Sequence, residues 1–571
     1  MRWWPGLILV VIGLVPRAAS AELDLTLGGR IQSNIRYRPS ETLVGDFYDR
    51  RVLADGFARN EHILKLKANA TTERFAGIID VDLVWLGFAR TATLDDLSLR
   101  EVDEPVRIEA QSAYIEGIDL FVEGLDLRVG YQIINWGVAD QFNPTNNLNA
   151  DDLEDRLLFG TQQSNLMARL DYAVSDNITF SGALVPIFRP ALLPNSAPLA
   201  VGAVDRLPHL DVDFRRRLHA EAAASENFGY PTLVDDALIQ LPDPTAENMQ
   251  FMLRAATVIF EQDLSLSYYY GRSDFPVPID NFTQQLMGQQ CNPSNAMDCI
   301  DGTLGTTVTL AYPKMQVAGL NLTGEVDLLG WASESIAPIG YRMEVGVYFP
   351  RQQRLAMRQS EIVILGQTRP AGEYAYPDGE RPLVLDDTPF AKWTLGLDYT
   401  FNEHVYVNVM WVHGLADEFG AGDFFSDGKV VREGGVTSDP DTTNTCALVD
   451  QNGDECAREV LRNRIGDYLV AGVDLRFMDG NLLFRMFTIL ELTGYTEDLY
   501  RRSLGRRVTN NFSPLSPEGF SAVLFPELSY NFGQGLELAV GALFELGKSY
   551  TKFGEAAAGG NVGWFRGVYN F

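Results

Sequence analysis

The acidic run at positions 450–455 has the most metal-like spacing of this 571-residue chain. Asp450, Asn452 and Asp454 place three side-chain oxygens at alternate positions, which suits a tight loop around a hard cation such as Ca²⁺. The EF-hand loop also needs a glutamate at its last position, and that position here is Leu461. A calcium site is therefore one hypothesis, and an acidic loop without a metal is the other.

The four cysteines form two close pairs, Cys291 with Cys299 and Cys446 with Cys456. Four cysteines allow three pairings, and closeness in sequence favours the two local ones. In an exported chain this arrangement is typical of loop disulfides, whereas a zinc site would need shorter C-x-x-C spacing with a histidine nearby. We therefore expect two disulfides, each closing a loop.

Histidine spacing gives no support to catalysis. No nucleophile, general base or metal pattern can be recognised among the five, which are His62, His209, His219, His404 and His413. The sequence predicts a protein that is not an enzyme and that holds no cofactor other than the calcium considered above. A hydrolase is the remote alternative.

The segments between these loops have the period of β-strands. From Phe390 to His413, an apolar, aromatic parity that includes Trp393, Leu395 and Leu397 alternates with small or polar residues, on both sides of a short polar turn. Each arm has about 10 residues, enough for a tilted strand to cross a bilayer.

This hairpin unit recurs along the chain. We predict about 18 strands, with 16 as the alternative count, in which short turns alternate with gaps of roughly 15 to 60 residues. The asymmetry predicts an all-β fold, a transmembrane antiparallel β-barrel with short periplasmic turns and long extracellular loops. A soluble β-sandwich is the alternative. The predicted strands and hairpins are Leu23–Arg38, Arg59–Gly87, Val106–Trp136, Asn165–Phe188, Met249–Gly271, Thr306–Phe349, Phe390–His413, Ile465–Leu492, Gly519–Glu545 and Asn561–Phe571.

Both ends of the chain fit an exported barrel. Met1–Ala21 has a basic start, a 13-residue apolar run and a small-x-small end, so we expect a secretory signal peptide, followed by a barrel over residues 22–571. The last strand alternates and finishes on Phe571, which resembles the insertion signal of bacterial outer-membrane barrels. We expect the outer membrane of a Gram-negative bacterium as the location.

The formal charge of −30 argues against nucleic acid as a partner. It suits acidic loops outside a cell, where divalent cations bridge anionic lipid, and it also suits a surface that repulsion keeps soluble. We expect outer-membrane lipid, lipopolysaccharide and the barrel-assembly machinery as partners. The polar strand parity carries both charge signs, and we expect it to face an aqueous lumen, because basic side chains at the bilayer midplane cost about 2–4 kcal/mol each.

Two long gaps are candidates for narrowing such a lumen. The first contains Trp136, Asn143 and Asp151; the alternative is an interface aromatic followed by an ordinary loop. The second gap, residues 189–249, contains Arg215, Arg216 and Arg217, which would form a constriction attractive to anions if the segment folds inward. The alternative there is a solvated basic face.

The first gap also carries a resemblance. Gly130-x-Gln132-x-x-Asn135-Trp136-Gly137, followed by Asn143-Pro144 and Asp151, resembles a family of proteobacterial porin-like outer-membrane barrels of unassigned function, often encoded beside RND-type exporters and a periplasmic partner protein. Tyr312-Pro313 and Gly319, before a strand with Glu344, are similar to that family too. The resemblance implies passage of a hydrophobic or lipid-like substrate across the outer membrane, with an exporter as partner.

The sequence thus favours a monomeric or trimeric porin-like channel or conduit that passes a small or hydrophobic solute across the outer membrane. The alternative from another class is a surface adhesin or assembly platform, with the 450–455 loop binding calcium. An outer-membrane hydrolase is more remote.

Overall fold

A computed structural model describes most of the chain. The described residues are 23–44, 51–53, 55–57, 60–87, 106–154, 160–194, 232–285, 289–292, 295–301, 304–327, 337–364, 367–374, 376, 379–420, 424–425, 428–434, 455–501, 506–555 and 558–571. The predicted signal peptide, Met1–Ala21, lies outside them. Among them there is no helix long and apolar enough to span a membrane.

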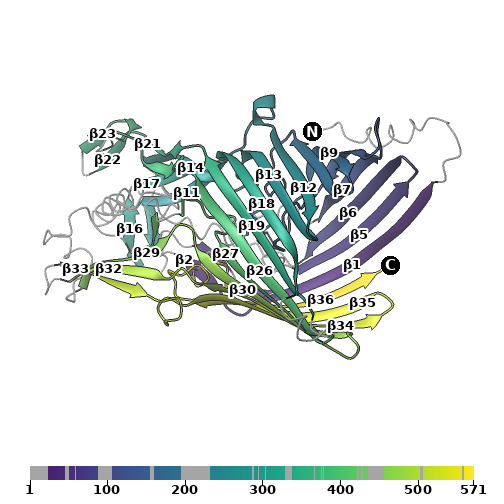
Figure 1. Cartoon of the computed structure of the whole chain (residues 1–571). Coiled ribbons are helices and arrows are strands. Elements are labelled where there is room, and N and C mark those ends of the chain that lie inside the picture. The colour runs from purple at the N-terminus through teal and green to yellow at the C-terminus, as the bar shows by residue number, and fades with distance from the viewer. Residues whose placement is uncertain are drawn as a thin grey trace.

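Within this described part, eighteen long strands form one closed antiparallel barrel (Figure 1). The sheet closes because the first strand pairs with the last, from Arg30 opposite Asn570 to Tyr37 opposite Gly563. A two-residue strand, β4 (Gly56–Phe57), extends the sheet beside the first strand. The barrel strands are β1 (Asp24–Arg38), β5 (Asn60–Thr71), β6 (Phe75–Gly87), β7 (Val106–Gly117), β8 (Leu125–Gln132), β9 (Asn165–Ser175), β10 (Ile178–Val185), β12 (Gln250–Ile259), β13 (Gln262–Arg272), β18 (Lys314–Val326), β19 (Ile339–Pro350), β26 (Phe390–Asn402), β27 (Val405–His413), β30 (Asp467–Phe477), β31 (Leu482–Glu491), β34 (Ser521–Gly533), β35 (Leu536–Gly547) and β36 (Val562–Asn570). The predicted fold class is confirmed.

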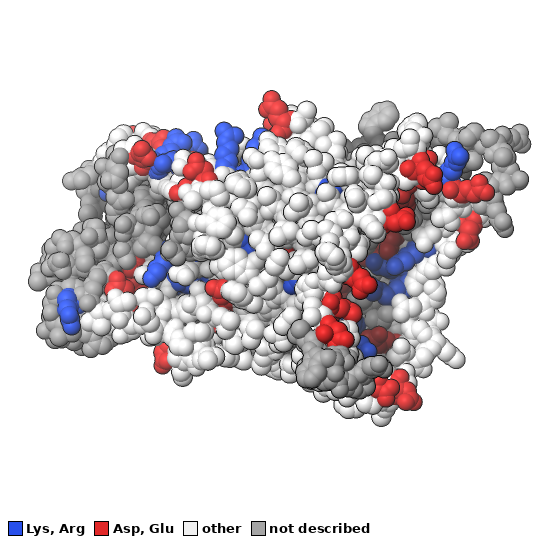
Figure 2. Space-filling view, in the orientation of Figure 1, with Lys and Arg blue, Asp and Glu red and all other residues white. Residues whose placement is uncertain are grey.

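The strands alternate between an outer apolar face and an inner polar face. On β1, Ile31 and Ile35 are exposed outward, whereas Gln32 and Asn34 on the other parity are buried inward. The outer wall over β13, β18 and β19 shows few charged side chains (Figure 2). An apolar outer band around a polar interior is the pattern of a barrel embedded in lipid.

The two ends of the barrel differ. Short turns join the hairpins at one end, where the C-terminus also lies, and we call it the turn end (Figure 1). At the other, the loop end, the connections form small sheets. One contains β11 (Thr232–Gln240), β17 (Leu304–Ala311), β14 (Val277–Gln285), β21 (Ala356–Gln359) and β24 (Gly372–Glu373), and another contains β28 (Lys429–Gly434), β29 (Glu455–Asn463), β32 (Tyr495–Arg501) and β33 (Arg506–Phe512). Two-stranded pairs are β2 (Thr42–Val44) with β3 (Arg51–Leu53), β15 (Gln289–Asn292) with β16 (Asn295–Asp301), β20 (Gln353–Arg354) with β25 (Leu383–Leu385), and β22 (Ile362–Ile364) with β23 (Gln367–Arg369).

Strand boundaries differ from the sequence prediction most clearly in two places. The predicted strand that begins at Thr306 is two strands, because β17 belongs to a loop-end sheet and the barrel strand β18 begins only at Lys314. Pro313 lies between the two strands and favours a break there, because proline has no N–H to donate to a sheet ladder. The second difference concerns residues 133–136, which leave the barrel wall after β8.

Replacing Leu266 by arginine is expected to destabilise the folded barrel by about 2–4 kcal/mol, because Leu266 is in the middle of β13 and 58% exposed on the lipid face. Ile259 is a matched control: it also faces outward but is the last residue of β12, beside a turn, where the same change costs about 0–1 kcal/mol. Equilibrium urea unfolding in lipid vesicles measures both. Equal losses at the two positions would argue against a membrane-embedded wall.

Candidate constriction site

The connection from β8 to β9 folds into the barrel over its described residues, 133–154 and 160–164, and we call these residues the inward loop. Asn321 on β18 donates its side-chain N–H to the carbonyl of Trp136 (2.9 Å). Thr394 on β26 donates its hydroxyl to the carbonyl of Phe142 (2.7 Å). In barrel order four strands separate β8 and β18, so the inward loop reaches across the lumen rather than following its own wall.

Glu344 on β19 is the main anchor of the inward loop. Its side chain is 0% exposed, and its carboxylate accepts four hydrogen bonds from the loop. One oxygen accepts the N–H groups of Val138 (2.8 Å) and Ala139 (3.2 Å), and the other accepts the N–H and the hydroxyl of Thr145 (both 2.8 Å). Hydrogen bonds to an ionised carboxylate are the stronger kind, so this contact holds the loop firmly to the wall.

Two glycines make room for the loop at the same place. A Cβ atom on Gly319 of β18 would meet Oγ of Ser267 on β13 and would lie 2.7 Å from Cγ2 of Thr145, and one on Gly346 of β19 would lie 3.0 Å from the carbonyl oxygen of Pro144. Tyr348, also on β19, donates its hydroxyl to that same carbonyl (2.6 Å). The wall therefore has a recess that fits the Pro144-Thr145 corner.

Replacing Gly319 by valine is expected to displace Thr145, weaken the seating of the loop by about 1–3 kcal/mol and raise the ion conductance of the channel. Gly472 on β30 is the matched control, because it also lies on the lumen parity but the nearest atom to an added Cβ, on Asn408, is 4.0 Å away. Single-channel recording compares the two variants. If the Gly319→Val channel has the same conductance as the Gly472→Val channel, Gly319 is not needed to make room for the loop.

Asparagine side chains fix the shape of the inward loop. Asn149 accepts the N–H of Ile134 (2.8 Å) and donates to the carbonyls of Gln132 (3.0 Å) and Gln163 (2.8 Å), which ties the start of the loop to its end. Asn143 accepts the N–H of Ala139 (2.8 Å), closing a turn at the tip. Asn143 and Asn149 therefore stabilise the conformation of the loop.

Apolar side chains of the inward loop pack against two parts of the wall. Ile134, Trp136 and Leu148 are buried in a cluster with residues of β9, β10, β12, β13, β18 and β19. Phe142 at the tip packs against a second cluster, built from β27, β30, β31, β34, β35 and β36. Contact with both parts of the wall narrows the lumen.

The lumen face of the wall carries charges of both signs in ion pairs, some within one strand and others between strands. Figure 2 shows such side chains in the hollow near β1 and β36. The pairs include Lys65 with Asp82 (3.4 Å), Arg128 with Glu116 (2.6 Å), Arg169 with Asp171 (2.7 Å), Arg342 with Asp398 (2.7 Å), Arg485 with Asp474 (2.8 Å) and Arg566 with Glu527 (3.1 Å). Neither sign dominates this lining.

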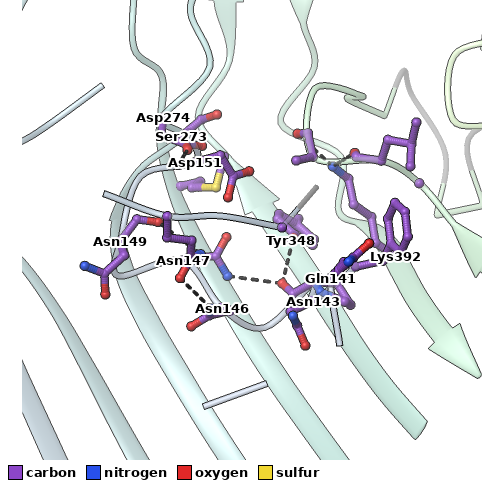
Figure 3. Close-up of a pocket in the computed structure, with 18 of the residues that line it drawn as sticks. Gln141, Asn143, Asn146, Asn147, Asn149, Asp151, Ser273, Asp274, Tyr348 and Lys392 are labelled. Carbon is purple, nitrogen blue, oxygen red and sulfur yellow. Dashed lines mark hydrogen bonds between the residues drawn. The ribbon is translucent and has the colours of Figure 1, made fainter. Parts of the chain in front are cut away.

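A cavity of about 110 Å³ lies between the inward loop and the wall (Figure 3). Asp151 and Asp274 lie on one side of it, and Lys392 lies on the other. The N–H of Asp151 donates to Asp274 (2.8 Å). Burial raises the pKa of both carboxyl groups, and repulsion from Asp274 raises the pKa of Asp151 further.

Of the predicted site residues, Trp136, Asn143 and Asp151 belong to the inward loop. Trp136 is 3% exposed, with the guanidinium of Arg169 lying 5.8 Å from its ring centre, so it is not an aromatic of the membrane interface. Asn143 closes the tip turn, and Asp151 lines the cavity.

Other predicted sites stay predictions. Arg215, Arg216 and Arg217, together with Asp450, Asn452, Asp454 and Cys446, lie outside the described residues. Strands β15 and β16 place Cys291 directly opposite Cys299, and Cys456 lies on β29, but the two disulfides remain expectations. In the described part of the chain, no three His, Cys, Asp or Glu side chains come together as a metal site.

The sequence did not single out Lys392, Asp274 or Gly346 as site residues, and it gave Glu344 and Gly319 only as part of a resemblance. One signal for Lys392 was available, since it lies on the inward parity of an otherwise small or apolar strand start. The others gain their role only from the position of the inward loop.

The closed strand order, the apolar outer face and the charged interior define a transmembrane antiparallel β-barrel. No protein-family model matches the chain, and no curated protein matches it significantly. Among solved structures, it is similar to Pseudomonas aeruginosa OccK11 (OpdR), with a TM-score of 0.40, 8% identity and 96% of each chain covered. It is also similar to Acinetobacter baumannii OccAB3, with a TM-score of 0.39 and 9% identity, over 95% of this chain and 99% of that one. The similarity to Salmonella typhi OmpF in complex with daunomycin has a TM-score of 0.34 and 8% identity, over 96% of this chain and 97% of that one. The class itself is defined by the strand pairing, which closes the sheet between β1 and β36.

Proposed function

We propose that the chain is a porin-like channel of the Gram-negative outer membrane, through which a small solute crosses along a charged lumen narrowed by the inward loop. The observation that supports this most is the seating of the loop on Glu344, since a loop held across the lumen controls what passes. With the turn end in the periplasm, the loop-end sheets face the exterior.

Planar-bilayer recording of the refolded chain tests this proposal. We expect steady openings whose current is well below that of an unobstructed 18-strand barrel, because the inward loop occupies part of the cross-section. A correctly folded barrel that never conducts, with or without a periplasmic partner, would contradict it.

We further propose that an RND-type exporter and its periplasmic partner deliver a hydrophobic solute to this channel. The support is the resemblance carried by Gly130, Gln132, Asn135-Trp136-Gly137 and Asn143-Pro144. A partner-gated conduit stays silent in pure lipid and opens when the periplasmic protein is added, whereas an independent channel conducts alone.

A further inference from the structure

The cavity under the inward loop contains ionisable side chains that form no ion pair with one another. Its two carboxyl groups, Asp151 and Asp274, come from the inward loop and from the segment after β13. Among the described residues, neither forms an ion pair with a basic side chain, although the N–H of Asp151 contacts Asp274. Burial disfavours the ionised forms of these two carboxyl groups, and an ammonium placed between them would lower both pKa values, so this acidic side of the cavity can accept a positive group.

The opposite side of the cavity carries Lys392, which is 3% exposed. Its ammonium donates to the carbonyls of Leu415 (2.6 Å) and Ala416 (3.3 Å), and it lies 5.2 Å from the ring centre of Tyr348. Within the described part of the chain no carboxylate contacts this ammonium. Carbonyl dipoles and a ring face hold the charge without neutralising it, so an anionic group can still gain by approaching it.

Asn146 also lines the cavity. Its side-chain N–H donates to Gln162 (2.9 Å), while its side-chain oxygen is buried without a hydrogen-bond partner among the described residues.

We propose that this cavity binds a small zwitterion of amino-acid size, with its ammonium held by Asp151 and Asp274 and its anionic group held by Lys392. The volume of about 110 Å³ has room for several water molecules, which matches a solute with a handful of non-hydrogen atoms. The inference deepens the proposed function, because it names the class of solute that the constriction selects.

Titration calorimetry on the folded protein in detergent tests the charge requirement without depending on transport. The probes are β-alanine, which carries both charges, and propylamine and propionate, which carry one each. We expect β-alanine to bind at least about tenfold more tightly than either single-charge analogue, because both sides of the cavity must be engaged. Equal affinity for β-alanine and propylamine, or no binding of β-alanine, would overturn the proposal.

Variants locate the binding. The double change Asp151→Asn and Asp274→Asn is expected to weaken β-alanine binding at least about tenfold, while Glu537→Gln, which removes a carboxylate near the turn end of β35, leaves it unchanged. If the double variant does not fold, the affinities of the unchanged protein for β-alanine, propylamine and propionate still test whether the cavity requires both charges. A conducting channel that binds no β-alanine contradicts this inference alone, whereas a silent barrel that binds it contradicts the proposed channel alone.

Discussion

Replacing Glu344 by alanine is expected to raise the single-channel conductance severalfold. The change leaves the N–H groups of Val138 and Thr145 without their acceptor and leaves Ala139 only its hydrogen bond to Asn143, and each unsatisfied buried donor costs about 1–3 kcal/mol. The inward loop should therefore leave the wall, so that these groups reach water and the lumen widens. Planar-bilayer recording measures the effect directly.

Two further variants serve as an intermediate case and as a control for the conductance of Glu344→Ala. Glu344→Gln keeps the size of the side chain and one acceptor oxygen, so we expect an intermediate conductance. Ser529→Ala also alters a lumen-facing residue of the wall, on β34, and should conduct like the unchanged protein. If Glu344→Ala folds and conducts no more than Ser529→Ala, the inward loop is not held by this carboxylate.

The largest expected loss of stability follows replacement of Arg462 by methionine. Arg462 on β29 is 3% exposed and forms ion pairs with Glu418 (2.9 Å) and with Glu491, at the place where a loop-end sheet meets the barrel rim. Removing the cation leaves two buried carboxylates without it, at a cost of about 3–5 kcal/mol. Arg485→Met is the matched control, since its side chain is 47% exposed and its pair with Asp474 contributes about 0–1 kcal/mol. Urea unfolding compares the two, and equal losses would contradict a special role for Arg462.

The same cluster gives the loop end a pH dependence with a defined sign. Burial opposes ionisation of Glu418, but Arg462 and then Lys552 outweigh it and lower its pKa to about 2. Because the folded pKa lies below the ordinary 4.5, the stabilisation is fully present above about pH 4.5 and is lost as pH falls through about 2. Arg462→Met should weaken this acid sensitivity, because Arg462 is the largest of the favourable causes and Lys552 remains.

The barrel could be predicted from sequence because a period of 2 is a local property. Every barrel strand alternates in the same way, and Trp393, Leu395 and Leu397 show the outward parity without any knowledge of their neighbours. The loop-end sheets were missed for the same reason: β17 alternates as a barrel strand does, and only its pairing with β11 and β14 distinguishes it.

The constriction could be predicted only in part. The inward loop stood out by its Asn and Pro residues, which form turns in any context. Its anchor did not, since Glu344 lies about 200 residues from Thr145 in sequence and only barrel closure brings them together. A single glutamate on a strand has no local signal that separates an anchor from one more lumen charge.

The most direct test of a lumen narrowed by the inward loop is the single-channel conductance of the chain before and after residues 138–147 are replaced by a short Gly-Ser linker. The segment contains every group that bonds to Glu344, together with the Pro144 carbonyl that accepts from Tyr348. We predict small, steady openings for the intact protein and a severalfold larger conductance for the shortened one. The same conductance from both folded proteins would contradict the account.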